Sequence, residues 1–309
     1  MQKNCNLVWQ NASNYKDKKD KDFSYTKNIT LIKEIIRNSS EIKDQLLVVK
    51  LPSLIIENDE LLTSFAEIIH LLDSCGVKIF IVHDHTNLVN DTLKLFGFDE
   101  KVINSIKVAD YKSSQIIEMV LSGYINKRIV SKLCSVGCYA IGISCKDTNL
   151  IQAKKSKLSH RRATNQDIID IGFISEPIIV NPEILINFED NNIIPVISPV
   201  ASDENGNTHL LDVNLTVSLI SSSLDADQLI LFYEESEFAE MQGFKVRDIN
   251  TLKDMLNLAT EPKKISLIEA ALNAIQSNTH CVHFVNATFP DSMLLSMFIN
   301  KENELWQED

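Results

Sequence analysis

Two short apolar runs decide the fold of this chain: Leu46-Leu-Val-Val-Lys50 and Lys78-Ile-Phe-Ile-Val-His83. Between them lies a stretch with helical spacing, about Asp59 to Ser74, which Gly76 ends. Two strands joined by a helix lie parallel in a sheet, because a connection of this length makes a crossover and not a hairpin. The stretch therefore predicts a β-α-β unit near the start of an α/β fold.

The alternation of strands and helices continues along the chain. Strands are predicted at 139–144, 173–181, 193–198, 228–232 and 281–285, and helices at 27–40, 87–95, 111–121, 126–135, 182–190, 213–224, 265–277 and 291–299. This order indicates a three-layer αβα sandwich with a mainly parallel central sheet. Ligands bind at the carboxyl ends of such strands, so we expect the site in the loops after Val49, Val82 and Phe232.

Composition limits the partners of the protein. Its 309 residues, 44% of them hydrophobic, can bury a large core. The net charge of -12 argues against nucleic-acid binding, which needs a clustered basic surface. The sequence contains no run of about 18 apolar residues and no signal-peptide pattern, so we expect a cytoplasmic protein with no membrane partner.

The six cysteines are scattered, as is typical of reduced thiols in a cytosol. Cys134, Cys138 and Cys145 lie near one another in the sequence and can be read as a metal site. Their spacing matches no zinc pattern, so no metal is predicted.

Several segments follow one another in the order found in a known family. Glu118-Met-Val-Leu-Ser-Gly-Tyr-Ile-Asn-Lys127 matches E-M-V-L-x-G-x-V-N-K, and Ala140-Ile-Gly-Ile-Ser-Cys-Lys-Asp147 matches A-V-G-L-S-G-K-D. They are followed by Ile171-Gly-Phe-Ile-Ser-Glu-Pro, Val180-Asn-Pro-Glu-Ile-Leu185, Ile194-Pro-Val-Ile-Ser-Pro199 and Asp203-Glu-Asn-Gly206. On these segments the chain resembles the N-acetyl-L-glutamate kinase family of the amino-acid kinase superfamily, over much of residues 27–300.

The resemblance implies the amino-acid kinase fold over residues 26–300, between polar tails at 1–25 and 301–309. It implies an acceptor-binding half at about 44–200 and a nucleotide-binding half at about 201–300, and its N-terminal helix implies a homo-oligomer, a dimer or a hexamer. The implied reaction, a step of arginine biosynthesis, is phosphorylation of the side-chain carboxylate of N-acetyl-L-glutamate by ATP with Mg²⁺. Such chemistry needs lysines on the transferred phosphoryl group, glycine loops that approach it, and a carboxylate that organises the lysines.

On the acceptor side, the resemblance assigns Lys50 to the first catalytic lysine. The family's glycine pair after that lysine is replaced by Leu51-Pro52-Ser53, and its H-G-G-G by His83-Asp84-His85-Thr86. Asp84 and His85 therefore occupy substrate-binding positions, where a carboxylate repels anions. Lys107 stands in place of an arginine that clamps the substrate, so the charge is kept but the planar fork is lost.

Leu210-Leu-Asp-Val-Asn-Leu-Thr216 falls on the family segment N-I-N-A-D-T-A. This alignment puts Leu210 in place of the substrate-binding asparagine and Asn214 in place of the organising aspartate. Asp212 can compensate for that aspartate, or it can cap the following helix.

On the nucleotide side, Tyr233-Glu-Glu-Ser-Glu237 replaces T-D-V-x-G, so Glu234 and Ser236 are weak nucleotide-binding candidates. Leu267 takes the position of the second catalytic lysine. Lys263 and Lys264 lie about one helical turn before it and are the candidates to replace that lysine.

The scaffold segments thus match the family while each site segment is altered. One hypothesis is an acetylglutamate kinase with weak or lost activity. The alternative is a pseudokinase that acts as a binding or assembly subunit. A third possibility, a kinase for a different carboxylate or carbamate, meets the same difficulty because the ATP side is altered too. Whether the chain is an enzyme stays open at this point.

Overall fold

The computed structural model describes residues 33, 35–85, 87–98, 101–103, 106–108, 111–155, 174–234 and 244–298. The chain divides into two units: Asp44–Met297, and Met1–Lys43 with Phe298–Asp309. The predicted tails at 1–25 and 301–309 lie outside the described residues, as does most of the predicted helix at 27–40. Residues 35–39 of that helix are described and are helical.

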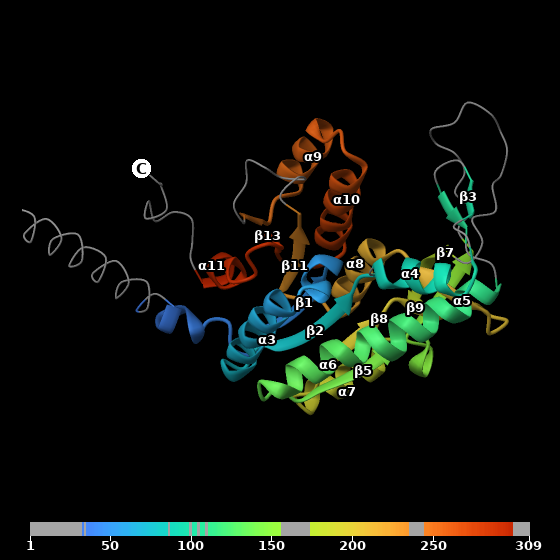
Figure 1. The fold of residues 1–309 in the computed structure, drawn as a ribbon. Helices are drawn as coiled ribbons and strands as arrows, with labels where there is room; N and C mark the ends of the chain where they lie inside the picture. The colour runs from blue at the N-terminus through green and yellow to red at the C-terminus, as the bar shows by residue number, and fades with distance from the viewer. Residues whose placement is uncertain are drawn as a thin grey trace, which may run out of the picture. The chain divides into compact units, whose positions relative to one another are not determined.

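The larger unit is built on a seven-stranded sheet with the order β12-β13-β11-β1-β2-β8-β5 (Figure 1). Its strands are β1 (Leu46–Leu51), β2 (Lys78–His83), β5 (Ala140–Ser144), β8 (Ile194–Ser198), β11 (Gln228–Tyr233), β12 (Phe244–Val246) and β13 (Val282–Asn286). Every neighbouring pair is parallel except β12 with β13. The predicted mainly parallel α/β sheet is confirmed.

Helices cover both faces of this sheet. α3 (Asp59–Ser74) and α6 (Asn126–Ser135) pack together on one face, where Phe65 of α3 meets Phe232 of β11 at a ring-centroid distance of 6.1 Å. Leu46 and Val48 of β1 point to the other face, into the core formed with α8 (Val213–Ser223) and α10 (Pro262–Gln276). Alternate residues of a strand point to opposite faces, so the apolar runs of the central strands serve both layers.

The remaining helices are shorter. They are α2 (Ser53–Glu57), α4 (Asn87–Leu95), α7 (Glu183–Asp190), α9 (Ile249–Leu258), α11 (Ser292–Phe298) and the 3₁₀ turn η2 (Asp147–Asn149). The sequence did not predict α2 or α9, whereas α4 has the predicted bounds. Among the described residues, no helix has the length and apolar character needed to cross a membrane.

One helical stretch runs through residues 111–135, where the sequence predicted two helices. α5 (Tyr111–Glu118) continues into the π-helical turns η1 (Met119–Ile125) and then into α6. The wider π turn carries the backbone through Gly123 without a break. Ser122 in this turn donates a hydrogen bond of 3.0 Å from Oγ to Ser198 Oγ, at the end of β8.

A close packing contact explains two of the scaffold motifs. The side chain of Asn126 donates from Nδ2 to the carbonyl oxygen of Val196 at 2.8 Å. Its Oδ1 lies only 1.8 Å from the place where a Cβ on Gly142 would stand. Only glycine fits at 142, because the Asn126 amide bridges α6 to the central sheet through that space.

A second, smaller sheet closes into a barrel with the order β10-β7-β6-β9. Its strands are β6 (Ile151–Lys155), β7 (Ile174–Val180), β9 (Val200–Ser202) and β10 (Thr208–Leu211), and β3 (Lys101–Ile103) pairs separately with β4 (Ile106–Val108). The predicted strand at 173–181 therefore forms, but in this barrel and not in the central sheet. The basic segment 154–162 is expected from the sequence to form a hairpin or a loop; its residues 154 and 155 belong to β6, and the rest lie outside the described residues.

Candidate functional site

A cavity of about 270 Å³ opens at the carboxyl ends of β1 and β2, beside the start of α8. It is lined by Lys50, Asp84, His85, Leu210, Leu211, Asp212, Val213 and Asn214. These residues meet because β1 and β2 are in parallel register, with Leu51 opposite His83, and because β10 leads directly into α8. Five predicted site residues from three separate segments thus share one cavity.

Lys50 and Asp84 form the charged centre of this cavity. Lys50 Nζ lies 3.5 Å from Asp84 Oδ2, and Lys50 is buried, with 8% of its surface exposed. Asp84 Oδ1 also accepts a 2.8 Å hydrogen bond from the backbone N–H of His85 and lies 3.3 Å from His85 Nδ1. The side chain of Asp84 is therefore held by an ammonium group, an amide and an imidazole.

The pKa of Asp84 is lowered by these neighbours. Burial alone would raise it, but the charges of His85 and Lys50 and their hydrogen bonds outweigh burial and bring it below the usual 3.8. Asp84 is thus a carboxylate at neutral pH. Lys50 and the backbone N–H of His85, which could receive a substrate anion, already bind the carboxylate of Asp84.

The segments that follow β1 and β2 lack the glycines of a typical phosphate-binding loop. Residues 52–58 and 84–86, which follow β1 and β2 in the sequence, include no glycine. Pro52 has no N–H and stands immediately before α2. The His85 amide donates to Asp84. A phosphate-binding loop needs several backbone N–H groups that point to one place, and the loops after β1 and β2 do not have the glycines that usually allow it.

Asn214 of α8 and Leu267 of α10 are the positions that the resemblance assigns to the family's aspartate and second lysine. Asn214 Nδ2 donates a 2.8 Å hydrogen bond to Ser266 Oγ, and Asn214 Oδ1 is buried without a partner among the described residues. Leu267, which follows Ser266, is 3% exposed and lies in the hydrophobic core. A neutral pair and an apolar side chain therefore stand at the positions where the resemblance predicts a carboxylate and an ammonium group.

Asp212 lines the cavity and also caps α8. It precedes α8, and its Oδ1 accepts a 2.9 Å hydrogen bond from the backbone N–H of Leu215. The prediction that Asp212 caps the helix is confirmed.

Among the residues that the structure describes, the candidates on the nucleotide side do not line the cavity. Glu234 follows β11, and Lys263 at the start of α10 lies with Nζ 3.7 Å from Glu234 Oε2. The side chain of Lys263 is 74% exposed, and neither it nor Lys264 lines the cavity. Ser236 lies outside the described residues, and Lys107 lies in β4 with a side chain that is not described.

The described residues do not fit bound Mg-ATP. Glu234 and Asp84 present carboxylates at the edge of the sheet where phosphates would approach, and each is already paired with a lysine. A phosphate chain at this edge needs cationic and N–H donors more than it needs acceptors. The described groups provide neither a cradle for phosphate nor a lysine aimed at it from α10.

A serine–histidine–aspartate chain lies apart from this cavity, in the small barrel. Ser175 Oγ lies 2.6 Å from His209 Nδ1, and His209 Nε2 lies 3.2 Å from Asp203 Oδ2. This arrangement was not predicted from the sequence, because Ser175 lies far along the chain from Asp203 and His209. Ser175 is only 1% exposed, so its hydroxyl cannot meet a substrate as a catalytic nucleophile must.

This chain instead stabilises the turn between β9 and β10. Burial would raise the pKa of Asp203, but hydrogen bonds from Asn207, His209 and Asn205 lower it to about 2. A carboxylate held by so many donors is typical of a structural turn.

Comparisons with known proteins identify the family and the relatives of this chain. The model of the amino acid kinase family matches residues 45–286. The acetylglutamate kinase of Archaeoglobus fulgidus is 29% identical over 277 residues, 88% of this chain and 96% of that protein. The acetylglutamate kinase of Campylobacter hominis is 32% identical over 264 residues, 83% of this chain and 88% of that protein.

Solved structures agree on the fold. The N-acetylglutamate synthase from Neisseria gonorrhoeae, complexed with coenzyme A and N-acetyl-glutamate, superposes with a TM-score of 0.69 at 16% identity, over 88% of this chain and 61% of that one. Giardia carbamate kinase superposes with a TM-score of 0.58 at 11% identity, over 82% and 97%. With the family model matching most of its length and acetylglutamate kinases among its relatives, the chain belongs to the amino acid kinase family.

Proposed function

We propose that this chain is an acetylglutamate kinase-like protein whose phosphoryl-transfer activity is weak or lost. Its ancestral reaction is the ATP-dependent phosphorylation of the side-chain carboxylate of N-acetyl-L-glutamate, as its relatives indicate. The observation that carries the proposal is the Asp84 carboxylate, 3.5 Å from Lys50 and hydrogen-bonded to the His85 amide.

Asp84 opposes the ancestral reaction in two ways. It neutralises the ammonium group that would otherwise stabilise the transferred phosphoryl group. It also repels the acceptor carboxylate and the phosphate, by about 4 kcal/mol for two unit charges 4 Å apart at an effective dielectric constant of 20. Solvent at the mouth of the cavity reduces this figure, but both effects act against the same transition state.

The second half of the catalytic arrangement is also changed. Asn214 cannot orient lysines by charge, and Leu267 is packed in the core where the second lysine would stand. The loss of one charge-stabilising donor typically lowers the rate by about 100- to 1000-fold. Losing both the second lysine and the free charge of Lys50 therefore supports activity far below that of a carboxylate kinase.

A chain without activity still retains a fold that can bind ligands and assemble into an oligomer. We propose N-acetyl-L-glutamate and ATP with Mg²⁺ as its ancestral ligands, and a homo-oligomer in the cytoplasm as its state. The division into an acceptor-binding half at 44–200 and a nucleotide-binding half at 201–300 belongs to the same proposal. Its remaining role is then that of a pseudokinase subunit in arginine biosynthesis.

The test is acyl-phosphate formation from ATP and N-acetyl-L-glutamate, trapped as the hydroxamate, with Lys50→Ala alongside. We expect no turnover above the background of this variant, from wild-type protein shown to be folded by circular dichroism. If Lys50→Ala does not fold, the Lys50→Ala/Asp84→Ala double variant removes both charges and replaces it as the background. Turnover by the wild type that vanishes in the variant would refute the loss of activity and show that the chain is a working kinase.

A further inference from the structure

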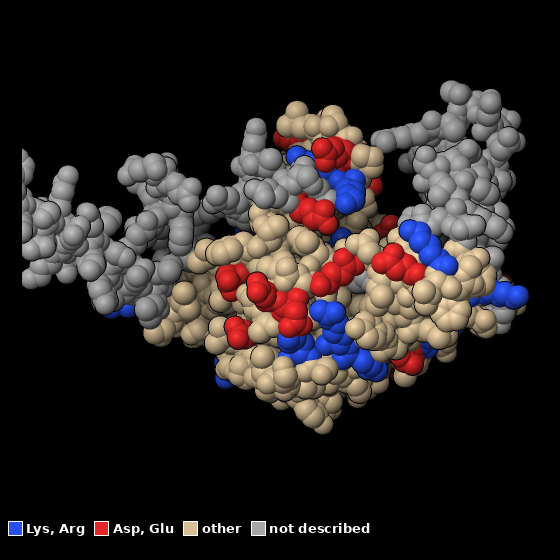
Figure 2. Space-filling view, viewed as in Figure 1, with Lys and Arg blue, Asp and Glu red and all other residues tan. Residues whose placement is uncertain are grey.

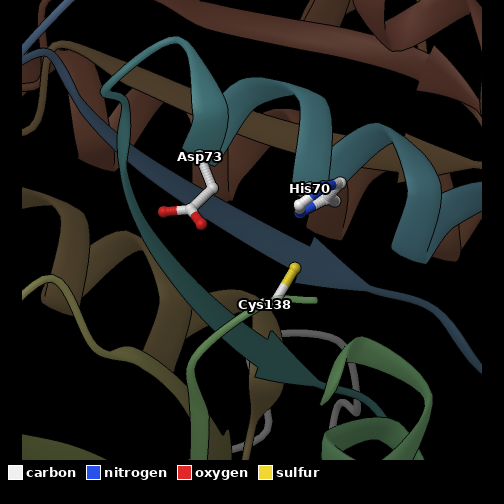
Figure 3. A group of neighbouring side chains, drawn as sticks. All are labelled: His70, Asp73 and Cys138. Carbon is white, nitrogen blue, oxygen red and sulfur yellow. The ribbon is translucent and has the colours of Figure 1, made fainter. Parts of the chain in front are cut away.

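A cluster of three metal-ligating side chains lies away from the cavity, on the face of the sheet covered by α3 and α6. His70 and Asp73 belong to the last turns of α3, and Cys138 stands in the turn between α6 and β5. One ligand atom from each of them lies within 4.8 Å of the other two. Figure 3 shows the imidazole, the carboxylate and the thiol facing a common space.

The fold gives this cluster a defined shape. His70 and Asp73 are three residues apart, so they share one face of the helix. Gly137, with φ at +104°, turns the chain toward Cys138, and a Cβ at this position would stand 3.2 Å from His70 Cε1. The missing side chain at 137 thus leaves room for the imidazole beside the thiol.

The donor atoms are not used by other groups of the described structure. His70 Nδ1 is buried and has no hydrogen-bond partner there. Cys138 is 5% exposed. The nearest cation, Lys78, hydrogen-bonds instead to the carbonyl oxygen of Glu189 at 3.3 Å and to the side chain of Asn192. A buried imidazole nitrogen without a partner calls for an explanation, and a bound ion is one.

The surroundings favour positive charge. α3 ends at Ser74 and α6 at Ser135, so two helix C-termini approach the cluster, each equivalent to about half a negative charge. Burial raises the pKa of Asp73, and burial together with Asp73 and Cys134 raises the pKa of the Cys138 thiol to about 12. A bound metal ion would favour the ionised forms of both groups, because a cation attracts the Asp73 carboxylate and displaces the proton of the Cys138 thiol.

We propose that His70, Asp73 and Cys138 form a binding site for a zinc-class divalent cation. A thiolate, an imidazole and a carboxylate are the ligands that Zn²⁺ accepts in tetrahedral sites, and the thiolate disfavours Mg²⁺ and Ca²⁺. With bonds of about 2.0 to 2.3 Å, tetrahedral ligand atoms stand roughly 3.3 to 3.8 Å apart. Side-chain rotations that draw the three atoms together by about an ångström complete the site.

The proposed ion has a structural role. It would tie the end of α3 to the turn after α6, the two helices that pack together on this face. The sequence did not reveal the site, because its ligands come from segments about seventy residues apart and only Cys138 belongs to the cysteine group. Cys134 approaches Cys138 but is exposed, with Sγ 3.8 Å from the carbonyl oxygen of Ala140, and serves as the matched control.

The test is a cobalt titration of the full chain carrying Cys5→Ser, which removes a thiol that lies outside the described residues. We expect Co²⁺ to produce the near-ultraviolet charge-transfer band of a thiolate ligand and Zn²⁺ to abolish it by competition. The band should vanish in Cys138→Ser and persist in Cys134→Ser. Zinc affinity, measured against a chromophoric chelator, should fall more than about 10-fold in His70→Gln and in Asp73→Asn.

Three results would overturn the site: no thiolate band, a band that survives in Cys138→Ser, or equal loss in Cys134→Ser. Should Cys138→Ser not fold, unchanged zinc affinity in His70→Gln and Asp73→Asn would overturn it as well. Thermal melting gives a second readout. Zn²⁺ should raise the melting temperature of the wild type and not that of His70→Gln, since only a ligand of the folded state stabilises it.

Discussion

Replacing Asp84 by asparagine removes the negative charge beside Lys50 while keeping the shape of the side chain. The amide oxygen of asparagine can still accept the 2.8 Å hydrogen bond from the His85 N–H, so the loop after β2 should be maintained. Lys50 loses its counter-ion and becomes available to an anion from solution. We therefore expect Asp84→Asn to bind N-acetyl-L-glutamate more tightly than the wild type.

The size of the gain follows from the distances. An anion on Lys50 Nζ would stand about 5 Å from the Asp84 carboxylate, given the 3.5 Å ion pair. At an effective dielectric constant of 20, two such charges repel by about 3 kcal/mol. The Asp84 side chain is 22% exposed, so solvent screening reduces the figure. About 1 to 2 kcal/mol remains, which corresponds to roughly 5- to 30-fold in affinity.

Isothermal titration calorimetry at neutral pH and constant ionic strength measures this gain. The matched control is Asp212→Asn, which removes one charge from the same cavity while asparagine still caps α8. Thermal melting checks that Asp84→Asn is folded, because a buried lysine without a counter-ion lowers stability. An affinity unchanged in Asp84→Asn, or raised equally in Asp212→Asn, would show that the ion pair does not block the site.

Two further predictions concern stability. Gly142→Ala should lower the free energy of unfolding by about 1 to 3 kcal/mol in urea titrations, because the added Cβ would overlap the side chain of Asn126. The control is Gly206→Ala, whose Cβ would meet no atom within 4 Å. This control measures the effect of a positive φ alone. An equal loss at both glycines would contradict the packing explanation. His83 and His283 are fully buried, and burial lowers the pKa of His83 to about 4 and that of His283 to about 3, from 6.5. Their neutral forms therefore support the fold above pH 6.5, and stability should fall as the pH drops toward 4, by about 2 kcal/mol per histidine at pH 5. Urea midpoints between pH 7.5 and 5 measure this, and a flat profile in that range would refute it.

The sheet could be predicted because its strands are buried on both faces. β1, β2 and β11 are short runs of apolar residues bounded by turn residues, and such runs have few other possible structures. The small barrel was not predicted, because a short run such as β7 does not show which sheet it will join. The pairing of β7 with β6 and β10 depends on residues far away in the sequence.

The candidate cavity could be located but not described from the sequence. The sequence placed Lys50 and Asp84 at the ends of two strands and Asn214 near the start of a helix, and the structure brings the three together. It did not show that Asp84 would pair with Lys50, since an ion pair depends on side-chain direction. The position of Leu267 in the core likewise depends on how α10 packs on α8.

Figure 2 shows acidic and basic side chains intermixed over one face of the molecule. Arg128 and Lys132 both approach Asp59, at 3.6 and 3.3 Å. Exposed pairs of this kind contribute little to stability. The expected absence of nucleic-acid partners remains a prediction from the net charge of the whole chain.

The ion pair between Lys50 and Asp84 also bears on how such a site can change over generations. An ammonium group buried to this degree needs a counter-ion whether or not it ever touches a phosphate. Removing either partner of a buried pair typically costs about 3 to 5 kcal/mol, a large share of the stability of a domain. Once an aspartate stands at position 84, the lysine is retained by the needs of folding alone. A lysine at the end of the first strand is then no evidence of turnover by itself, because the folding of the chain already accounts for its presence.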